Sequence, residues 1–254
     1  MSFAEYSVGD GPNLTLVHGW GFGAAAWQPV VSLLADFFTV HVVDLPGYGA
    51  TPPASGNTLE SLADTLAESL PPRAMLCGCS LGAMVCMACA ARHPRKVARM
   101  VLASGTASFV QREGWTEALP RAQLDQFIDQ LEENPVALLK HYSTLMNHGD
   151  IHARELVRAL RLREEIPADA STLRAGLELL GEVDLRRLAT EVLQPTLLVH
   201  GSADAVMPSA AAQRLARLLY EGSVDIFEGS AHAPFASDPA RFVDAVTAFA
   251  GVAS

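Results

Sequence analysis

Basic residues are in the minority in this sequence: 18 Lys and Arg stand against 28 Asp and Glu, for a formal net charge of −10 at pH 7. This balance argues against a protein that binds nucleic acid over its whole surface, because phosphate backbones attract basic surfaces. The first residues, Met1 to Tyr6, hold neither the basic region nor the apolar segment of an export signal. With no export signal and with cysteines that look unpaired, we expect a cytoplasmic protein with no nucleic-acid and no membrane partner. We also expect a monomer.

Cysteine is scarce, and its four copies, Cys77, Cys79, Cys86 and Cys89, fall in one stretch. Zinc sites usually place their ligands on turns, whereas these cysteines lie inside apolar runs, where free cysteine behaves as a small hydrophobic residue. We therefore interpret them as core residues and expect no metal or other cofactor. The surrounding run, residues 74–91, lacks charge and is nearly long enough to span a membrane. A strand, a turn and a helix buried in an α/β core also explain it.

One motif organises the chain, Gly78-Cys79-Ser80-Leu81-Gly82. A strand-like apolar run, residues 74–77, precedes it, and a helix-like run, residues 81–91, follows it. Two glycines let a strand turn into a helix so tightly that the serine between them sits strained at the apex. In this context the motif predicts a nucleophilic serine whose hydroxyl projects into solvent. An ordinary Gly-Ser turn is the alternative.

Strand and helix patterns alternate on both sides of the motif. Strands are predicted at residues 14–17, 38–43, 74–77, 97–103, 195–201 and 223–227, and helices near residues 25–34, 59–70, 81–91, 209–220 and 239–252. Asn57-Thr58-Leu59-Glu60 predicts a helix N-cap with a capping-box glutamate. Strands that alternate with helices indicate crossover connections and a mainly parallel sheet. The expected fold class is α/β.

The alternation stops after Ser104, and the strand pattern disappears between residues 112 and 187. Four helices are predicted there. Asn134-Pro135 begins one of them, because proline suits the first helical position, and Asp150 is expected to cap the next. We therefore expect an α/β core, residues 1–111 and 188–254, with an inserted all-helical cap, residues 112–187, over the functional edge of the sheet.

A serine nucleophile needs a base, and the base needs an orienting carboxylate. Asp204 lies in the loop after one predicted strand, and His232 follows the last one. The carboxyl ends of parallel strands meet at one edge of a sheet, where such sites form. The order Ser80, Asp204, His232 is the order found in α/β-hydrolases. We therefore predict these three residues as the catalytic triad.

Acyl transfer also requires backbone N–H donors for the oxyanion. Leu81, directly after the nucleophile, is one predicted donor. The loop His18-Gly19-Trp20 should supply the other, from the Trp20 N–H, and the Trp20 ring could line an acyl pocket. We interpret His18 as a packing or hydrogen-bonding residue rather than a catalyst.

These motifs together resemble the α/β-hydrolase superfamily over the whole chain. The segments that carry the resemblance are Val17-His18-Gly19-Trp20-Gly21, Val43-Asp44-Leu45-Pro46-Gly47-Tyr48-Gly49, Gly78-Cys79-Ser80-Leu81-Gly82 and Ala231-His232-Ala233-Pro234-Phe235. Within the superfamily, Trp20, residues 176–186 and the His-Ala-Pro-Phe segment resemble the biotin-pathway esterases that demethylate pimeloyl-acyl-carrier-protein methyl ester. Within the motif around Ser80, the resemblance leads us to expect a bulky aromatic residue at the position of Cys79, and this sequence has cysteine there instead.

The resemblance implies a serine carboxylesterase that works through an acyl-enzyme, with the triad and oxyanion donors named above and with an acyl ester as substrate. It implies substrate contacts from Trp20, Ser80, Leu81 and His232 and from five consecutive cap residues, Tyr142, Ser143, Thr144, Leu145 and Met146. It further implies that cap arginines dock an acyl carrier protein. Arg154 and Arg158 match that pattern, whereas Ala137 and His141 stand where the family has arginines.

The arginines of this region form a cluster: Arg154, Arg158, Arg161 and Arg163 stand against one acid, Glu155, between residues 152 and 163. The spacing of the first three places them on one helix face, which is either a carrier-docking surface or an ordinary solvated face.

Two other functions stay open. The same triad serves carbon–carbon bond hydrolases and perhydrolases, and a hydrolase scaffold can also act as a ligand-binding receptor.

Overall fold

The computed structural model describes residues 5–53, 56, 58–161 and 168–252. Within them a seven-stranded sheet runs in the order β1-β3-β2-β4-β5-β6-β7. The strands are β1 (Glu5–Val8), β2 (Asn13–Val17), β3 (Thr39–Val43), β4 (Ala74–Cys79), β5 (Val97–Ala103), β6 (Thr196–Gly201) and β7 (Gly222–Phe227). All neighbours pair in parallel except β1, which pairs antiparallel with β3. The predicted mainly parallel sheet is confirmed, and β1 is an addition that the apolar pattern did not predict.

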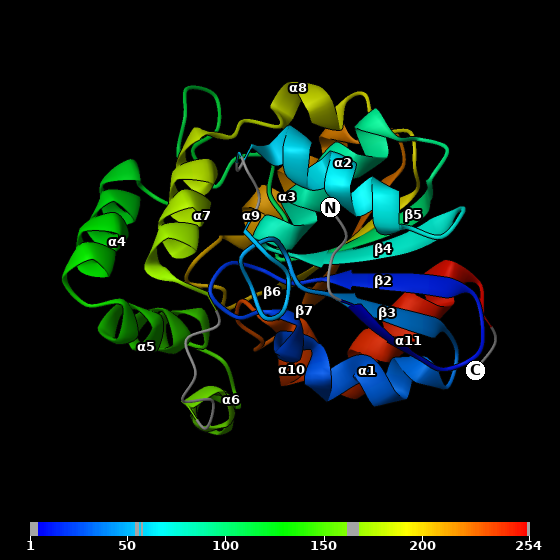
Figure 1. Ribbon diagram of the computed structural model, residues 1–254, viewed down its shortest axis with the longest axis horizontal. Helices are drawn as coiled ribbons and strands as arrows, with labels where there is room; N and C mark the ends of the chain where they lie inside the picture. Colours follow the sequence, from blue (N-terminus) through cyan, green and yellow to red (C-terminus); the bar gives the residue numbers. More distant parts are fainter. Residues whose placement is uncertain (1–4, 54–55, 57, 162–167, 253–254) are drawn as a thin grey trace.

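Helices cover both faces of the sheet, and others lie beyond the carboxyl ends of its strands (Figure 1). They are η1 (Ala24–Trp27), α1 (Gln28–Ala35), α2 (Leu59–Ser69), α3 (Leu81–Arg92), α4 (Arg121–Glu133), α5 (Pro135–Met146), α6 (Ala153–Arg161), α7 (Ala170–Glu182), α8 (Arg186–Ala189), α9 (Ser209–Leu218), α10 (Pro234–Ser237) and α11 (Pro239–Ala250). In Figure 1, α1 and α11 lie on one face and α2 and α3 on the other. The α/β fold class is thus confirmed.

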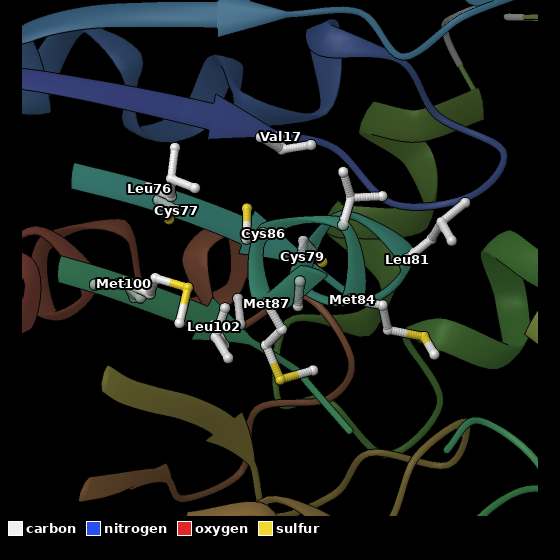
Figure 2. Packing of buried hydrophobic residues seen from close by; sticks show 14 of the residues in the cluster. Val17, Leu76, Cys77, Cys79, Leu81, Met84, Cys86, Met87, Met100 and Leu102 are labelled. Atoms are coloured by element: carbon white, nitrogen blue, oxygen red, sulfur yellow. The ribbon is translucent and has the colours of Figure 1, made fainter. Parts of the chain in front are cut away.

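The core is centred on β4 and α3, the two elements that flank the Gly-x-Ser-x-Gly motif. Every residue of β4 is buried, and so are the first ten of α3, as expected for a stretch without charge. The four cysteines are buried with free thiols and belong to the hydrophobic cluster. Figure 2 shows Cys77 and Cys86 among Leu76, Met87 and Met100. In the described part of the chain no helix is both long and apolar enough to span a membrane.

The helix α2 begins at Leu59, where the sequence pattern placed its start, but its capping box differs from the predicted one. Thr58 is its N-cap, and the capping box is closed by Ser61, whose hydroxyl and backbone N–H exchange hydrogen bonds with Thr58. The prediction of Glu60 as the capping-box residue is therefore wrong. The capping-box residue lies three places after the N-cap, and with Thr58 as N-cap this residue is Ser61. Asn57 lies outside the described residues.

The predicted cap region contains α4, α5, α6 and α7, which gather beyond the carboxyl ends of the strands in Figure 1. Asn134 caps α5 by accepting a hydrogen bond from the Ala137 N–H, with Pro135 at the first helical position. The boundary expected at residue 187 falls inside the short helix α8. Asp150 was predicted to cap the next helix, but its carboxylate bonds mainly to the core, as described below.

Candidate active site

Ser80 lies at the sharp turn between β4 and α3, with φ 52° and ψ −113°. A non-glycine residue at positive φ is strained, and such strain collects at functional sites. The surroundings require both motif glycines: a Cβ on Gly78 would lie 2.5 Å from the Gly82 carbonyl oxygen, and one on Gly82 would lie 2.3 Å from the Val17 carbonyl oxygen. The sequence motif therefore encodes a turn in which backbone segments come too close for side chains.

The Ser80 side chain does not project into bulk solvent as the motif predicted, because Ser80 is only 5 % exposed. It lines a pocket beneath the cap together with His232, the predicted base. Among the described residues, neither the Ser80 hydroxyl oxygen nor Nε2 of His232 has a hydrogen-bond partner. Both atoms are thus available to a bound substrate.

Asp204 and His232 form a buried pair on the loops after β6 and β7. Nδ1 of His232 lies 2.7 Å from Oδ2 of Asp204. The other carboxylate oxygen, Oδ1, accepts hydrogen bonds from the backbone N–H groups of Val206 and Met207 at 2.9 and 2.8 Å. This geometry holds the carboxylate rigidly and directs Nε2 of His232 toward the pocket, because the carboxylate occupies Nδ1.

The electrostatics of Asp204 depend on two opposing influences. Burial is the larger single influence and disfavours the charged form. The electrostatic attraction of His232, together with the polar contacts of His232 and His200, outweighs it, so the pKa of the Asp204 carboxyl is held below its ordinary value. Asp204 therefore carries a negative charge at neutral pH, as a carboxylate that orients and stabilises an imidazolium must.

The backbone of His232 is fixed at both of its polar groups. Its N–H donates to the carbonyl oxygen of Met146, the last residue of α5 in the cap, at 3.0 Å. Its carbonyl oxygen accepts a hydrogen bond from the Ser104 hydroxyl, after β5, at 2.8 Å. The position of His232 thus depends on the cap as well as on the core, which the sequence did not reveal.

The loop of His18, Gly19 and Trp20 lies directly against the Ser80 turn, since a Cβ on Gly19 would be 3.3 Å from that of Ser80. In the described residues the backbone N–H groups of Trp20 and Leu81 donate to no backbone carbonyl, which suits their predicted role. The Trp20 indole Nε1–H donates to the Leu173 carbonyl oxygen of α7 at 2.8 Å. The cap therefore contacts this loop as well.

His18 acts as a structural residue of this loop. Its Nε2 accepts a hydrogen bond from the Leu45 N–H at 2.9 Å, and its Nδ1 lies 2.7 Å from the Gly19 carbonyl oxygen. Burial lowers the pKa of the His18 imidazole, although the Gly19 carbonyl and the Asp44 carboxylate act in the opposite direction. Both ring nitrogens are occupied, which agrees with the interpretation of His18 as a hydrogen-bonding residue.

The pocket above Ser80 is mainly apolar and has a cavity volume of about 90 Å³. Its walls come from the core and from the cap, and they include Trp20, Phe22, Trp27, Tyr142, Met146, Leu156 and Phe235. The Trp20 and Tyr142 rings meet edge to face, with centroids 5.0 Å apart. An apolar wall of this kind suits an acyl chain.

Of the five consecutive cap residues predicted to contact substrate, the structure brings Tyr142 and Met146 to the pocket. Residues four apart share a helix face, and α5 turns the intervening residues elsewhere. Ser143 is buried outside the pocket lining, Thr144 is exposed and donates its hydroxyl to the Lys140 carbonyl oxygen, and Leu145 is partly buried against the core. Ser143, Thr144 and Leu145 thus lie outside the lining of this pocket, and their contact with a substrate stays a prediction.

The side chain of Leu81 likewise lies elsewhere. It lines a second, smaller hollow under α7, beside Leu45 and Gly176. Leu81 can therefore serve the site through its backbone N–H, while its side chain is part of the contact between core and cap.

Asp150 contacts the site in a way that the sequence did not indicate. Its Oδ2 accepts the N–H of Ala231 at 2.8 Å, and its Oδ1 accepts the N–H of His152 at 2.8 Å and the hydroxyl of Ser237 at 3.1 Å. The carboxylate thus joins the cap to the residue directly before His232. An aspartate placed just before a helix matches an N-cap pattern, and the chain carries no local signal of the core contact.

Arg154 and Arg158 are exposed on α6, and no acidic partner for either is recorded among the described residues. The side chain of Arg161 and the whole of Arg163 lie outside what the structure describes. The exposed basic face thus comprises at least two cations, one helical turn apart.

The fold and the motif geometry match known proteins. Residues 16–245 match the sequence profile described as the Alpha/beta hydrolase family. The chain belongs to the alpha/beta hydrolase family. An esterase from Exiguobacterium antarcticum shares this fold with a TM-score of 0.90 at 21% sequence identity, over 98% of this chain and 95% of that one.

Curated relatives within the alpha/beta hydrolase family are considerably more similar in sequence. A pimeloyl-[acyl-carrier protein] methyl ester esterase from Aromatoleum aromaticum is 40% identical over 235 residues, which cover 90% of this chain and 94% of the relative. A protein of the same name from Nitrosomonas europaea is 35% identical over 240 residues, covering 93% and 95%. The resemblance stated from the sequence motifs is confirmed.

Proposed function

We propose that this alpha/beta hydrolase is a serine carboxylesterase that hydrolyses the methyl ester of a pimeloyl group carried on acyl carrier protein. One observation carries the chemistry: Ser80, strained at its turn, shares an apolar pocket with His232, whose other ring nitrogen is held by the buried Asp204. The relatives named as pimeloyl-[acyl-carrier protein] methyl ester esterases support the substrate.

In the first half-reaction, the Ser80 hydroxyl oxygen attacks the ester carbonyl carbon while Nε2 of His232 takes its proton. The negative charge that forms on the carbonyl oxygen is stabilised by the N–H groups of Trp20 and Leu81. His232 then gives the proton to the departing methoxide, which leaves as methanol. The acyl group remains on Ser80 as an ester.

In the second half-reaction, a water molecule attacks this acyl-enzyme and His232 accepts one of its protons. Collapse of the intermediate breaks the bond to the Ser80 oxygen, which recovers the proton from His232. The product is the free carboxylic acid. Asp204 remains ionised throughout, and it stabilises the imidazolium form of His232.

The cap supplies the partner surface in this proposal. An acyl carrier protein is acidic, and Arg154 and Arg158 expose two cations on α6, whose Leu156 lines the pocket. The carrier would rest on this face while its acyl arm enters beneath the cap. Exposed charges of this kind act mainly on the association rate and its salt dependence.

The test compares a carrier-bound methyl ester with a small free ester. The double variant Arg154→Glu with Arg158→Glu should raise KM for the carrier-bound ester and leave the small ester nearly unchanged. The wild-type preference for the carrier-bound ester should shrink as salt rises past physiological strength, where screening acts within about 8 Å.

The matched control is Arg187→Glu with Arg217→Glu, which makes the same change in net charge at exposed positions on α8 and α9. It should leave both substrates unaffected. Two results would contradict carrier docking at this face. One is an equal loss of activity on both esters in the α6 variant. The other is an equal effect of the α6 pair and the control pair on KM for the carrier-bound ester.

A further inference from the structure

A second histidine contacts the triad carboxylate. His200 lies at the end of β6, four residues before Asp204, and it is completely buried, at 0 % exposure. Its Nε2 lies 3.1 Å from Oδ2 of Asp204 and 2.8 Å from the carbonyl oxygen of Met207. The mechanism described above makes no use of it.

The surroundings determine which form of His200 is present. Both atoms near Nε2 are acceptors, so Nε2 carries a proton. It donates this proton to the nearer acceptor, the Met207 carbonyl oxygen, and the same N–H lies beside the Asp204 carboxylate. Nδ1 is buried and has no partner among the described residues. A proton on Nδ1 would leave a buried donor unsatisfied, which is costly. His200 is therefore the neutral imidazole with its proton on Nε2.

His200 and His232 approach the same carboxylate oxygen. Oδ2 of Asp204 is hydrogen-bonded to Nδ1 of His232 at 2.7 Å and lies 3.1 Å from Nε2 of His200. The other oxygen, Oδ1, accepts hydrogen bonds from the backbone N–H groups of Val206 and Met207. Because a polar N–H group beside a carboxylate stabilises its charge, it weakens the attraction that the same charge exerts on another neighbour.

We propose that His200 is a positioning residue of the active site, which holds the Asp204 carboxylate in place and limits its attraction for the His232 proton. His200 thereby sets the acidity at which His232 ceases to act as a base. This inference rests on the proposed function, since it takes His232 to be the base.

Other titratable groups face this pair from two neighbouring elements. Burial raises the pKa of the Cys79 thiol on β4 and of the Tyr142 phenol on α5, and the negative charge of Asp204 adds to both shifts. Both side chains thus stay neutral over the range in which a histidine titrates. The Asp150 carboxylate contacts the His232 loop through the Ala231 N–H.

The test follows the acid limb of kcat/KM for a small ester under conditions where chemistry limits the rate. His200→Leu removes the N–H group from beside the carboxylate. The midpoint of the acid limb should then move to higher pH by about 0.5 to 1 unit, which corresponds to losing part of the energy of a charge-assisted hydrogen bond. His200→Gln keeps an N–H in nearly the place of Nε2, so its midpoint should stay near that of the wild type.

Thr196→Val is the matched control on the same strand. It removes a buried side-chain hydrogen bond, from Thr196 to the Gln194 carbonyl oxygen, at the opposite end of β6. General damage to β6 would lower the rate in both variants, but it would not move the midpoint. An unchanged or lowered midpoint in His200→Leu overturns the proposal.

A measurement on the wild type does not depend on the folding of any variant. ¹⁵N spectra of histidine-labelled protein should show His200 with its proton on Nε2, still neutral at the pH where His232 becomes protonated. A proton on Nδ1 of His200, or protonation of His200 before His232, overturns the proposal. The Ser80→Ala variant separates this inference from the proposed function. If Ser80→Ala is active, the esterase mechanism itself is contradicted. If Ser80→Ala is inactive but His200→Leu has the midpoint of the wild type, only the role of His200 is contradicted.

Discussion

The contact between Asp150 and the His232 loop leads to a prediction about both stability and turnover. Asp150→Ala removes the acceptor of three donors, which belong to Ala231, His152 and Ser237. His152 is exposed and can bond to water, and the Ser237 hydroxyl can rotate. Ala231 is completely buried, at 0 % exposure, so its N–H would be left without a partner.

The expected magnitude follows from these surroundings. A buried donor without a partner costs about 1–3 kcal/mol, and the loss of the hydrogen bonds to a carboxylate adds to this, so we expect unfolding to require about 2–4 kcal/mol less free energy. Because Ala231 directly precedes His232, the base should also be displaced. A misplacement of about 1 Å can cost about 10²-fold in rate, so kcat should fall by about that factor.

The assay combines urea unfolding with kcat for a small ester, measured well below the unfolding temperature. Asp150→Asn, which keeps the side-chain volume and one acceptor oxygen, should lie between the wild type and Asp150→Ala in both measurements. Thr58→Ala is the control for lost stability alone, because it removes the N-cap of α2 at about 1 kcal/mol and should leave kcat unchanged. Wild-type kcat in folded Asp150→Ala would refute the claim that Asp150 positions the His232 loop.

Three further predictions concern the pocket and its loops. Folding lowers the pKa of His18, so below about pH 6.5 the unfolded chain binds more protons than the folded protein. The free energy of unfolding must therefore fall on acidification, by up to about 1.4 kcal/mol per pH unit from this group. Urea unfolding from pH 7.5 to 5.5 should show a steeper loss of stability for the wild type than for His18→Gln, and equal slopes would contradict this. Burial raises the pKa of the Cys79 thiol, so iodoacetamide at pH 8 should leave activity intact, whereas rapid inactivation blocked by substrate would show a reactive thiol. Tyr142→Ala should lower kcat/KM at least tenfold because it removes a buried wall of the pocket, while Thr144→Ala, at an exposed position on the same helix, should match the wild type in the same assay.

The sequence predicted the parts of the fold that depend on local pattern. The strands β4 and β5, the Ser80 turn and the Asn134 cap of α5 follow from apolar periodicity, glycine spacing and the chemistry of capping. β1 escaped prediction because four residues with two polar side chains carry little strand signal. Its place in the sheet comes from antiparallel pairing with β3.

The candidate site was predictable where a motif encodes it and obscure where only the tertiary structure does. Ser80, Asp204 and His232 were predicted from their motifs and chain order, and the structure places the last two 2.7 Å apart. Asp150 and His200 reach the same site through contacts that no spacing reveals. The run from Tyr142 to Met146 was predicted to line the pocket throughout, although one face of α5 supplies only two of its residues.

The most direct test of the central claim is the covalent labelling of Ser80. A fluorophosphonate should add one phosphonyl group to the intact protein, peptide mapping should place it on Ser80, and the Ser80→Ala variant should take up no label. Because nucleophile and base act as a unit, Ser80→Ala should also lose turnover by a factor of about 10⁶. A label on another residue, or ester hydrolysis by Ser80→Ala near the wild-type rate, would contradict the proposal that this chain hydrolyses esters through an acyl-enzyme at Ser80.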